Sequence, residues 1–570
     1  MSEPLLSIED LSVAFRTDAG DFAAVDHISF DVKKGKTLII VGESGSGKSV
    51  TSLSILRLLP QPPLTSTGGR ILFHYNEKTI NLLSCSQAEL NALRGNAISM
   101  IFQEPMTALN PVKTLGSQVA ESLSTHFGIM GKAAREKAIA MFQQVQLPAP
   151  SELYHKYPHQ ISGGQKQRVM IAMAMICRPQ LLICDEPTTA LDVTVQKSIL
   201  LMLKELQQQY GMSVIFITHD MGVVSEIADE VVVMYKGKVV EKGAAKQVLF
   251  HPEAAYTKAL LRCRPALYRR GERLPVISDF LEPQTAPQVK KVITNSEVNK
   301  VFDPLLRVQN ASVWFPSKRN LTGKAVHFNK AVDDVSFEIF EGETLGLVGE
   351  SGCGKTSLGR ALLQLIPLKS GKISFRNRDL TRLSKNELAA LRTDMQIIFQ
   401  DPYSSLDPLQ KIGEAIAEPL KVHRPGFSEK QRRETVIALL EKVGLSASFY
   451  SRYPHEFSGG QRQRIVIARA LALKPSFVVC DESVSALDVS VQAQVLNLLN
   501  DLKKEFQFTA LFISHDLSVI RYISDRIMVM NKGKIEETGK AEDIYLHPSS
   551  SYTRKLIDSI PGKILNTVNG

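Results

Sequence analysis

The sequence repeats itself: motifs of its first half recur about 300 residues later, in the same order. The segment GESGSGKS at residues 42–49 returns as GESGCGKT at residues 349–356, an offset of 307. From Ser162-Gly-Gly-Gln and Ser458-Gly-Gly-Gln onward the two halves keep an offset of 296 without a gap. A repeat of this length predicts two copies of one folded unit. The total of 570 residues, about four times a typical 150-residue domain, agrees with several packed units.

The duplication predicts two domains, residues 1–262 and 305–570, joined by a linker at residues 263–304. Prolines interrupt this linker and charges are scattered along it, which is typical of an irregular connector. Within each half, short apolar runs such as residues 37–41 and 181–184 alternate with amphipathic stretches of helix length. This alternation predicts an α/β fold in which helices cover a mostly parallel sheet.

Composition excludes several classes of protein. Hydrophobic residues make up 44% and charged residues 22%, as in folded globular chains rather than disordered or fibrous ones. The six cysteines form no C-x-x-C pair, which favours a reducing compartment over a disulfide framework. We expect neither a secretion signal nor a membrane span, because no sufficiently long apolar run is present. The net charge of +10 would suit several anionic partners and, on a chain this long, selects none.

Both halves carry a candidate phosphate-binding loop. The pattern Gly-x-x-x-x-Gly-Lys-Ser/Thr follows an apolar run and precedes a helical pattern, as such a loop requires. Its glycines let backbone N–H groups converge on phosphate oxygens at a helix N-terminus. Lys48 and Lys355 are expected to face the terminal phosphates, and Ser49 and Thr356 to offer hydroxyls to Mg²⁺. An ordinary glycine turn is the alternative, but two matches at equivalent positions argue against it.

Two adjacent carboxylates end a buried apolar run in each half, at Asp185-Glu186 and Asp481-Glu482. The carboxyl ends of parallel strands are where open α/β folds bind ligands. Asp185 and Asp481 are candidates for the Mg²⁺ shell, whereas Glu186 and Glu482 are candidates to orient or deprotonate an attacking water. A solvated turn is the alternative reading of either pair taken alone.

Ser-Gly-Gly-Gln just before such a strand resembles the signature of ATP-binding cassette (ABC) ATPases, and six motif types occur in the family's order in both halves. The resemblance covers about residues 5–260 and 305–560. It implies that each half has a RecA-like parallel-sheet core, an antiparallel β portion and an α-helical subdomain. The mainly helical stretch at residues 85–160 is the candidate for that subdomain.

Motifs and resemblance together give three sets of expected site residues. The catalytic set is Glu186, His219, Glu482 and His515, in which the histidines act as γ-phosphate switches. The metal set is Ser49, Gln103, Asp185, Thr356, Gln400 and Asp481. The nucleotide set, in which the resemblance assigns both phenylalanines to adenine stacking, is Phe15, Gly42, Ser44, Gly45, Gly47, Lys48, Ser49, Gln103, Ser162, Gly163, Gly164, Gln165, Phe315, Gly349, Ser351, Gly352, Gly354, Lys355, Thr356, Gln400, Ser458, Gly459, Gly460 and Gln461.

The resemblance also implies that the signature of one cassette closes over ATP held by the other. One chain would then contain two composite sites, with Asp192 and Asp488 at the contact with the opposite site. Each half has the loop lysine, the catalytic glutamate, the signature serine and the switch histidine. We therefore expect both sites to hydrolyse MgATP. Binding and hydrolysis would alternately clamp and release the two halves.

The residues after each sensing glutamine, 103–111 and 400–408, resemble oligopeptide and dipeptide importers, as do the His-Pro-x-x-x-Tyr-Thr segments at residues 251–257 and 547–553. The fused arrangement is similar to the single-chain ATPases of microcin C-type or glutathione-type peptide importers, and we favour the former. Clustered C-terminal cysteines that bind an iron–sulfur cluster in some relatives are lacking, so no cluster is expected.

This resemblance implies two transmembrane permease subunits and an extracytoplasmic binding protein as partners, and no nucleic acid. The chain would then lie peripherally on the cytoplasmic face of a bacterial inner membrane. Two alternatives stay open: a cassette ATPase acting on ribosomes or nucleic acid, and the energising subunit of an exporter. Direction of transport depends on the resemblance alone, and the sequence does not identify the substrate.

Overall fold

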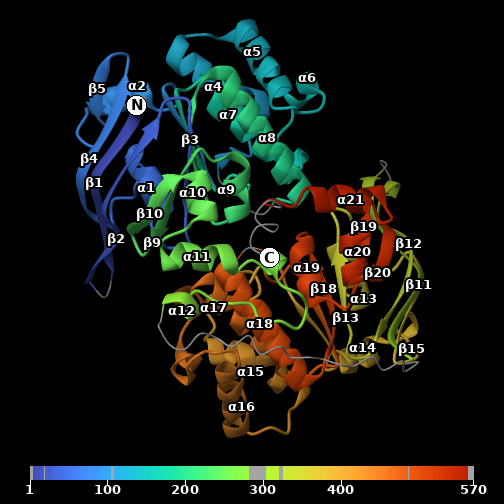
Figure 1. Cartoon of the computed structure of the whole chain (residues 1–570). Coiled ribbons are helices and arrows are strands. Elements are labelled where there is room, and N and C mark those ends of the chain that lie inside the picture. Colours follow the sequence, from blue (N-terminus) through green and yellow to red (C-terminus); the bar gives the residue numbers. More distant parts are fainter. Residues whose placement is uncertain are drawn as a thin grey trace.

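The computed structural model of the chain describes residues 4–17, 20–103, 108–188, 191–281, 303–319, 325–485 and 487–562. It has two similar α/β halves, one of which lies at the upper left and the other at the lower right of Figure 1. Among the described residues, no helix combines the length and the hydrophobicity needed to cross a bilayer. The fold class predicted from the repeat and the resemblance is confirmed in both halves.

Each half is built on a six-stranded sheet. In the first half the strand order is β10-β9-β3-β8-β7-β6, in which all neighbours are parallel except the outer pair β9 and β10. Strands β3, β7 and β8 are buried along their whole length, as expected for apolar strands covered by helices on both faces. The strands are β3 (Thr37–Val41), β6 (Ile98–Ile101), β7 (Leu181–Asp185), β8 (Ser213–Thr218), β9 (Glu230–Tyr235) and β10 (Lys238–Ala244).

A second, antiparallel sheet in the order β2-β1-β4-β5 packs beside it. These strands are β1 (Pro4–Thr17), β2 (Gly20–Lys33), β4 (Leu64–Tyr75) and β5 (Lys78–Asn81). Helices surround the two sheets, and α4 to α7 form a helical group at the top of Figure 1. The stretch predicted as mainly helical, residues 85–160, includes α4 to α6 but also strand β6 of the core sheet, and it ends before α7. The helices are α1 (Lys48–Ile55), α2 (Gln87–Leu93), α4 (Leu115–Phe127), α5 (Gly131–Gln144), α6 (Pro150–Leu153), α7 (Gly163–Met175), α8 (Val193–Tyr210), α9 (Met221–Ile227), α10 (Ala245–Phe250), α11 (Ala255–Arg262) and α12 (Ser278–Leu281).

The second half repeats this plan, with sheets in the orders β16-β17-β18-β13-β19-β20 and β12-β11-β14-β15. Its strands are β11 (Pro304–Arg319), β12 (Ala325–Phe340), β13 (Thr344–Val348), β14 (Ser370–Phe375), β15 (Arg378–Asp379), β16 (Met395–Ile398), β17 (Phe477–Asp481), β18 (Thr509–Ser514), β19 (Arg526–Asn531) and β20 (Lys534–Lys540). Its helices are α13 (Lys355–Leu362), α14 (Lys385–Leu391), α15 (Ile412–His423), α16 (Glu429–Lys442), α17 (Gly459–Leu471), α18 (Val489–Phe506), α19 (Leu517–Ile523), α20 (Ala541–Leu546) and α21 (Ser551–Asp558).

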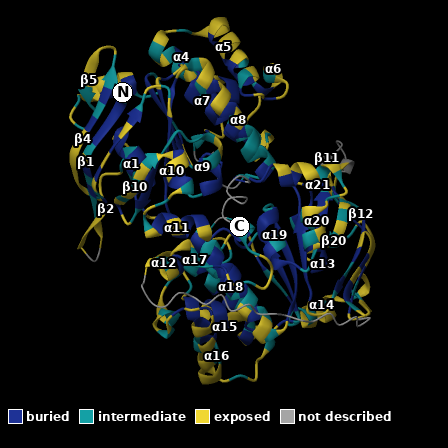
Figure 2. Cartoon of the chain, viewed as in Figure 1, coloured by how far each residue is buried: buried dark blue, intermediate teal, exposed yellow. Residues whose placement is uncertain are grey.

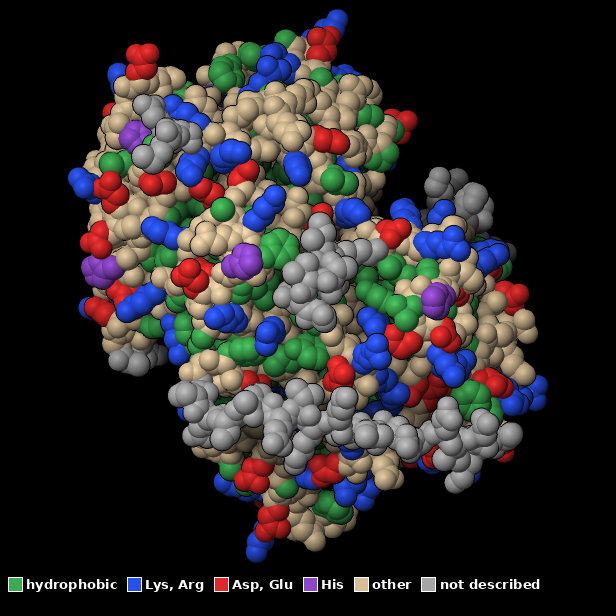
Figure 3. All heavy atoms as spheres, in the orientation of Figure 1, with side chains coloured by type: hydrophobic (Ala, Val, Ile, Leu, Met, Phe, Trp, Pro, Cys, Tyr) green, Lys and Arg blue, Asp and Glu red, His purple; other side chains and the backbone are tan. Residues whose placement is uncertain are grey.

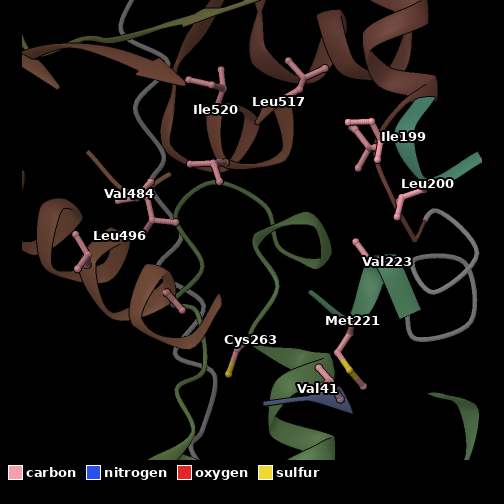
Figure 4. Packing of buried hydrophobic residues seen from close by; sticks show 14 of the residues in the cluster. Val41, Ile199, Leu200, Met221, Val223, Cys263, Val484, Leu496, Leu517 and Ile520 are labelled. Carbon is pink, nitrogen blue, oxygen red and sulfur yellow. The ribbon is translucent and has the colours of Figure 1, made fainter. Parts of the chain in front are cut away.

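The hydrophobic core is continuous across the two halves. One cluster of buried side chains includes residues of β3, α8 and α9 from the first half and of α18 and α19 from the second. Figure 4 shows part of it, where Ile199 and Val223 lie in the same view as Leu496 and Ile520, with Cys263 between the halves. In Figure 2 the strands of the central sheets are mostly buried, whereas exposed residues gather on the outer faces of the helices. The halves are thus packed together rather than merely tethered.

The segment that follows the first half crosses to the second half, although it was predicted as a connector from residue 263. The backbone N–H of Leu274 donates to Oδ1 of Asn497 on α18 at 3.0 Å, and Nδ2 of Asn497 donates back to the Leu274 carbonyl at 2.8 Å. The Tyr522 hydroxyl on α19 donates to the carbonyl of Glu272 at 2.8 Å. Residues 282–302 of the predicted linker lie outside the described residues.

The end of the second half makes the reciprocal crossing. Lys197 on α8 donates to the Asp558 carbonyl at 2.7 Å, and buried Arg264 donates to the Pro561 carbonyl at 3.3 Å. Each half therefore sends its tail onto helices of the other half.

Candidate functional site

The two glycine-rich loops have a shape that only glycine can adopt. A Cβ on Gly42 would lie 2.2 Å from the Met234 carbonyl oxygen, and one on Gly349 would lie 2.1 Å from that of Met530. Gly47 and Gly354, which precede α1 and α13, have φ angles of 99° and 110° in the left-handed region. The loops therefore lie close against β9 and β19, with their helix N-termini open to an anion.

The loop lysines are buried and held by the loops themselves. The Lys48 ammonium donates to the carbonyls of Gly42 at 2.7 Å and Glu43 at 2.8 Å. In the second half Lys355 makes the same two bonds, at 2.7 Å and 3.0 Å. Burial lowers the pKa of Lys48, although the carboxylates around it, Glu186 first, act in the opposite direction. Both ammonium groups thus occupy one fixed position inside the loop.

A hydroxyl and a carboxylate meet beside each loop. Ser49 Oγ donates to Asp185 at 3.0 Å, and Thr356 Oγ1 donates to Asp481 at 2.9 Å. Burial raises the pKa of Asp185 to about 6, despite the hydrogen bond from Ser49. Burial also raises the pKa of Asp481. A hydroxyl and a partly desolvated carboxylate are hard oxygen donors of the kind that Mg²⁺ accepts, so these pairs fit the expected ion.

The glutamates after the aspartates are held in an unusual backbone conformation. Glu186 and Glu482 have φ angles of 45° and 48°, a left-handed geometry that costs free energy for a glutamate. Their backbone N–H groups donate to the neighbouring strand, at Ile217 and Ile513. The sheet thus holds both carboxylates at its C-terminal edge, and strained residues of this kind cluster at functional sites.

Each glutamate carboxylate contacts the predicted glutamine and histidine of its own half. Nε2 of Gln103 donates to Glu186 at 3.4 Å, and Nε2 of Gln400 donates to Glu482 at 2.9 Å. Nδ1 of His219 lies 3.3 Å from Glu186, and Nδ1 of His515 lies 3.4 Å from Glu482. These groups and the loop lysine come from separate elements of the sheet edge.

These contacts affect protonation. Burial opposes a charge on His219, but the hydrogen bond and the negative charge of Glu186 outweigh it and raise the pKa of His219. Burial likewise opposes a charge on Glu482, and there His515 outweighs it and lowers the pKa of that carboxyl. The charged form of His219 is thus favoured in the first half, and the charged form of Glu482 in the second.

The signature residues lie at the N-termini of α7 and α17. Ser162 and Ser458 accept the backbone N–H of Gln165 and Gln461 in capping boxes, both at 3.4 Å. Both serines are exposed. Among the described residues, no hydrogen bond joins them to the opposite loop, so this structure does not bring signature and loop together.

Residues at the starts of α8 and α18 do contact the opposite half. Asp488 accepts the backbone N–H of Ser44, in the first loop, at 2.8 Å and lies 3.8 Å from His219. Ser490 donates to Glu43 of the same loop. In the other direction Thr194 donates to Glu350, in the second loop, at 2.8 Å. Each loop is therefore in contact with the opposite half.

The two crossings are not equivalent. Asp192 uses its carboxylate to cap α8, accepting the backbone N–H of Val195 at 2.9 Å, and it shares the single Thr194 hydroxyl hydrogen, at 2.7 Å, with Glu350. Asp488 has no such capping bond and reaches the opposite loop instead. Of the two predicted contact aspartates, only Asp488 makes the cross-half hydrogen bond itself.

The two phenylalanines expected at the adenine differ in exposure. Phe15 is half-buried and packs against the core of its half, whereas Phe315 is 38% exposed. They lie on β1 and β11, opposite Phe22 and Asn329 respectively.

Sequence reasoning missed several residues of the site. Glu43, Glu350 and Ser490 take part in the crossings described above but were assigned no role. Tyr256 and Tyr552 were noted only as parts of a tail pattern, yet their hydroxyls contact the loops. For the two tyrosines the available signal was their offset of 296, and for the two glutamates it was their offset of 307; a comparison of the halves could have used both.

Known families and relatives match the chain over both halves. The ABC transporter family matches residues 25–189 and 332–485, and the oligopeptide/dipeptide transporter C-terminal region matches residues 240–288 and 537–563. The chain is 48% identical over 568 residues to "Glutathione import ATP-binding protein GsiA" of Escherichia coli (strain K12) and of Shigella sonnei (strain Ss046). Each alignment covers 98% of this chain and 89% of the relative. Among solved structures, "Dimeric Structure of MJ0796, a Bacterial ABC Transporter Cassette" aligns at 28% identity and a TM-score of 0.38, over 41% of this chain and 98% of that one.

These matches confirm the expected fused ATPase of the peptide-importer type. The relatives are named for glutathione, the second of the two types between which the sequence left a choice. With both cassettes and both C-terminal regions matched, the chain belongs to the ABC transporter family, as an ATPase with two cassettes of the oligopeptide/dipeptide branch.

Proposed function

We propose that this chain hydrolyses MgATP at two sites shared between its cassettes and thereby drives import of a peptide-type substrate through separate permease subunits. The observation that carries the proposal is the pair of crossings in which each phosphate loop contacts the opposite half. The relatives' name makes glutathione the first substrate to test. We take the cassettes as residues 1–262 and 305–570, with residues 263–304 between them.

In this proposal the loop glycines and lysines hold the phosphates, and the paired hydroxyls and carboxylates hold Mg²⁺. The ion, when bound, neutralises phosphate charge. Glu186 and Glu482 orient a water and accept its proton, and the hydrogen-bonded glutamines and the neighbouring histidines hold those carboxylates in place. The remaining expected contacts, Phe15 and Phe315 at adenine and the signature residues from the opposite cassette, belong to the same proposal.

The signature serines are the part of the site that requires a movement. Ser162 and Ser458 must leave solvent and approach the opposite loops. Those loops already contact the opposite half through Asp488 and Thr194. Each ATP would then be enclosed by both halves, and hydrolysis would release them. The four key groups are present in both halves, so both sites are proposed to turn over.

Transport needs partners that this chain does not contain. We propose two membrane-spanning permease subunits and an extracytoplasmic binding protein, with the chain bound to the cytoplasmic face of the bacterial inner membrane. Docking near Gln400 is favoured by the exposed side chains of Tyr403 and Leu409, which are 65% and 86% exposed. On the face seen in Figure 3, basic and acidic side chains are interspersed, which offers no continuous basic track for nucleic acid on that face.

The catalytic assignment is tested with the double variant Glu186→Gln/Glu482→Gln. Loss of both bases should lower steady-state ATP turnover by about 10²-fold or more, while equilibrium binding of MgATP is retained. The exposed carboxylate Glu136, changed to Gln, is the matched control and should leave turnover unchanged. Turnover within about threefold of the unsubstituted chain would contradict the assignment.

The transport assignment is tested by purification of the tagged chain from membranes solubilised in detergent. We expect the tagged chain to be recovered together with two polytopic membrane subunits. Recovery with ribosomes or nucleic acid instead would overturn it.

A further inference from the structure

Each cassette is followed by a short helix whose tyrosine reaches back to the phosphate loop. Tyr256 lies on α11 and Tyr552 on α21, 296 residues apart, and both belong to the matched oligopeptide/dipeptide C-terminal region rather than to the matched cassette. The Tyr256 hydroxyl accepts the backbone N–H of Glu43 at 3.0 Å. The Tyr552 hydroxyl accepts the backbone N–H of Glu350 at 3.2 Å. The same contact thus occurs twice in one chain.

The peptide group that each tyrosine holds is the one that binds the loop lysine. The N–H of Glu43 and the carbonyl of Gly42 belong to one planar peptide unit. The tyrosine binds its N–H side, and Lys48 donates to its carbonyl side at 2.7 Å. The second half has the same arrangement, with Lys355 donating to the Gly349 carbonyl at 2.7 Å. Rotation of this peptide would break both hydrogen bonds at once.

Both tyrosine helices are fixed to the sheet that carries the loop. The two oxygens of Glu241, on β10, accept the backbone N–H groups of Glu253 and Ala254 at 2.9 Å and 3.1 Å, just before α11. Glu537, on β20, does the same for Ser549 and Ser550 at 2.7 Å and 3.1 Å, just before α21. Because the helix start is held in this way, the hydroxyl has a defined position relative to the loop.

The two tyrosines differ in burial: Tyr552 is half-buried, whereas Tyr256 is almost fully buried and shields its hydrogen bond from water. Tyr256 is 2% exposed, and its ring packs against that of Tyr235 at a centroid distance of 4.3 Å. Burial raises the pKa of both tyrosines, so each hydroxyl is neutral. Without the hydroxyl, the Glu43 N–H would lose its partner in a site that water enters poorly.

We propose that Tyr256 and Tyr552 are positioning residues for the phosphate loops: each fixes the peptide that holds the loop lysine in place for the terminal phosphates. The inference rests on the proposed role of Lys48 and Lys355. In this inference the C-terminal region of each half contributes to the ATP site through the phosphate loop, without contacting the nucleotide itself. A change in that region can thereby alter the affinity for ATP.

The test uses the full chain and the double variant Tyr256→Phe/Tyr552→Phe, which removes two oxygen atoms and keeps the rings. We expect the KM for MgATP to rise about tenfold while kcat stays within about twofold, because a bond that organises binding is lost and the catalytic carboxylates are untouched. Amide hydrogen exchange in the peptides covering residues 42–48 and 349–355 should become faster. Single variants should accelerate exchange only in their own loop.

Two controls separate this role from mere packing. Tyr235→Phe removes the hydroxyl from the ring that packs on Tyr256, and Tyr545→Phe removes the hydroxyl of a half-buried tyrosine of α20 beside Arg521. Both should leave KM and loop exchange unchanged. If the double variant has a KM within about twofold of the unsubstituted chain and unchanged loop exchange, the positioning role is wrong. An equal shift in Tyr235→Phe would also overturn it.

A third variant distinguishes failure of this inference from failure of the proposed function. Lys48→Ala/Lys355→Ala should abolish turnover if the lysines bind phosphate. If it does so while the tyrosine variants change nothing, only the positioning role fails. If the lysine variant keeps full turnover, the proposed site itself is wrong.

Discussion

At the scale of single residues, Glu43 is a carboxylate whose surroundings oppose its negative charge. Its carboxylate lies at the interface between the halves, where it accepts from Ser490, and Asp488 is close by. Burial, and secondarily the charge of Asp488, raise the pKa of Glu43 to about 7. The neutral form therefore suits this interface better than the charged form.

The pH dependence follows from the direction of that shift. The ordinary pKa of the carboxyl, 4.5, applies to the unfolded chain, so between about pH 4.5 and pH 7 the folded state holds the extra proton. The contribution of Glu43 to the free energy of unfolding is thus complete below pH 4.5 and is lost as the pH rises to about 7. Glu43→Gln keeps a neutral acceptor at all pH values. It should raise stability at pH 8 by about 1 kcal/mol, after screening by solvent, and leave it nearly unchanged at pH 4.5.

Thermal melting of both proteins at pH 4.5, 6 and 8 checks this. The difference in melting temperature between the Glu43→Gln variant and the unsubstituted chain should increase with pH. Glu136→Gln, at an exposed carboxylate, is the control and should give no such increase. A difference that decreases with pH would contradict the interface assignment of Glu43.

At the scale of elements, residues 264–281 connect the first cassette to helices of the second. Asn497 is 5% exposed and makes two hydrogen bonds to the backbone of Leu274, itself 1% exposed. Nearby, Arg273 and Asp501 form an ion pair at 3.0 Å whose side chains are largely exposed. One residue pair is thus buried and fully hydrogen-bonded, and the other is screened by water.

This contrast predicts unequal costs. Asn497→Leu would leave a buried N–H and a buried carbonyl without partners, which should cost about 2–4 kcal/mol. Asp501→Asn should cost under about 0.5 kcal/mol, because an exposed pair contributes little. Chemical denaturation of the full chain measures both. If both variants lower the free energy of unfolding equally, the docking of residues 264–281 does not depend on the buried Asn497–Leu274 hydrogen bonds.

The sequence predicted the elements well where periodicity and spacing were strong. The buried strands β3, β7 and β8 and the helices α4 to α6 were expected because apolar runs and amphipathic stretches mark them. The docking of residues 264–281 was not predictable, because its contacts use backbone groups of Glu272 and Leu274 and single polar side chains far away in sequence. Such contacts leave no periodic pattern.

At the scale of the whole molecule, the halves share one core and exchange tails. The motifs located the loops, the aspartate–glutamate pairs and the histidines, since each motif is local in sequence. They could not indicate that Asp488 crosses between the halves while Asp192 caps its own helix. That difference depends on how the halves pack, which repeated motifs alone do not specify.

The most direct test of shared sites is an electron cryo-microscopy structure of the Glu186→Gln/Glu482→Gln chain with MgATP. We expect Ser458 to lie within about 3 Å of the γ-phosphate held by Lys48, and Ser162 equally close to the one held by Lys355. If instead each cassette encloses its nucleotide alone, with both serines still in solvent, the account of two sites completed across the halves is contradicted.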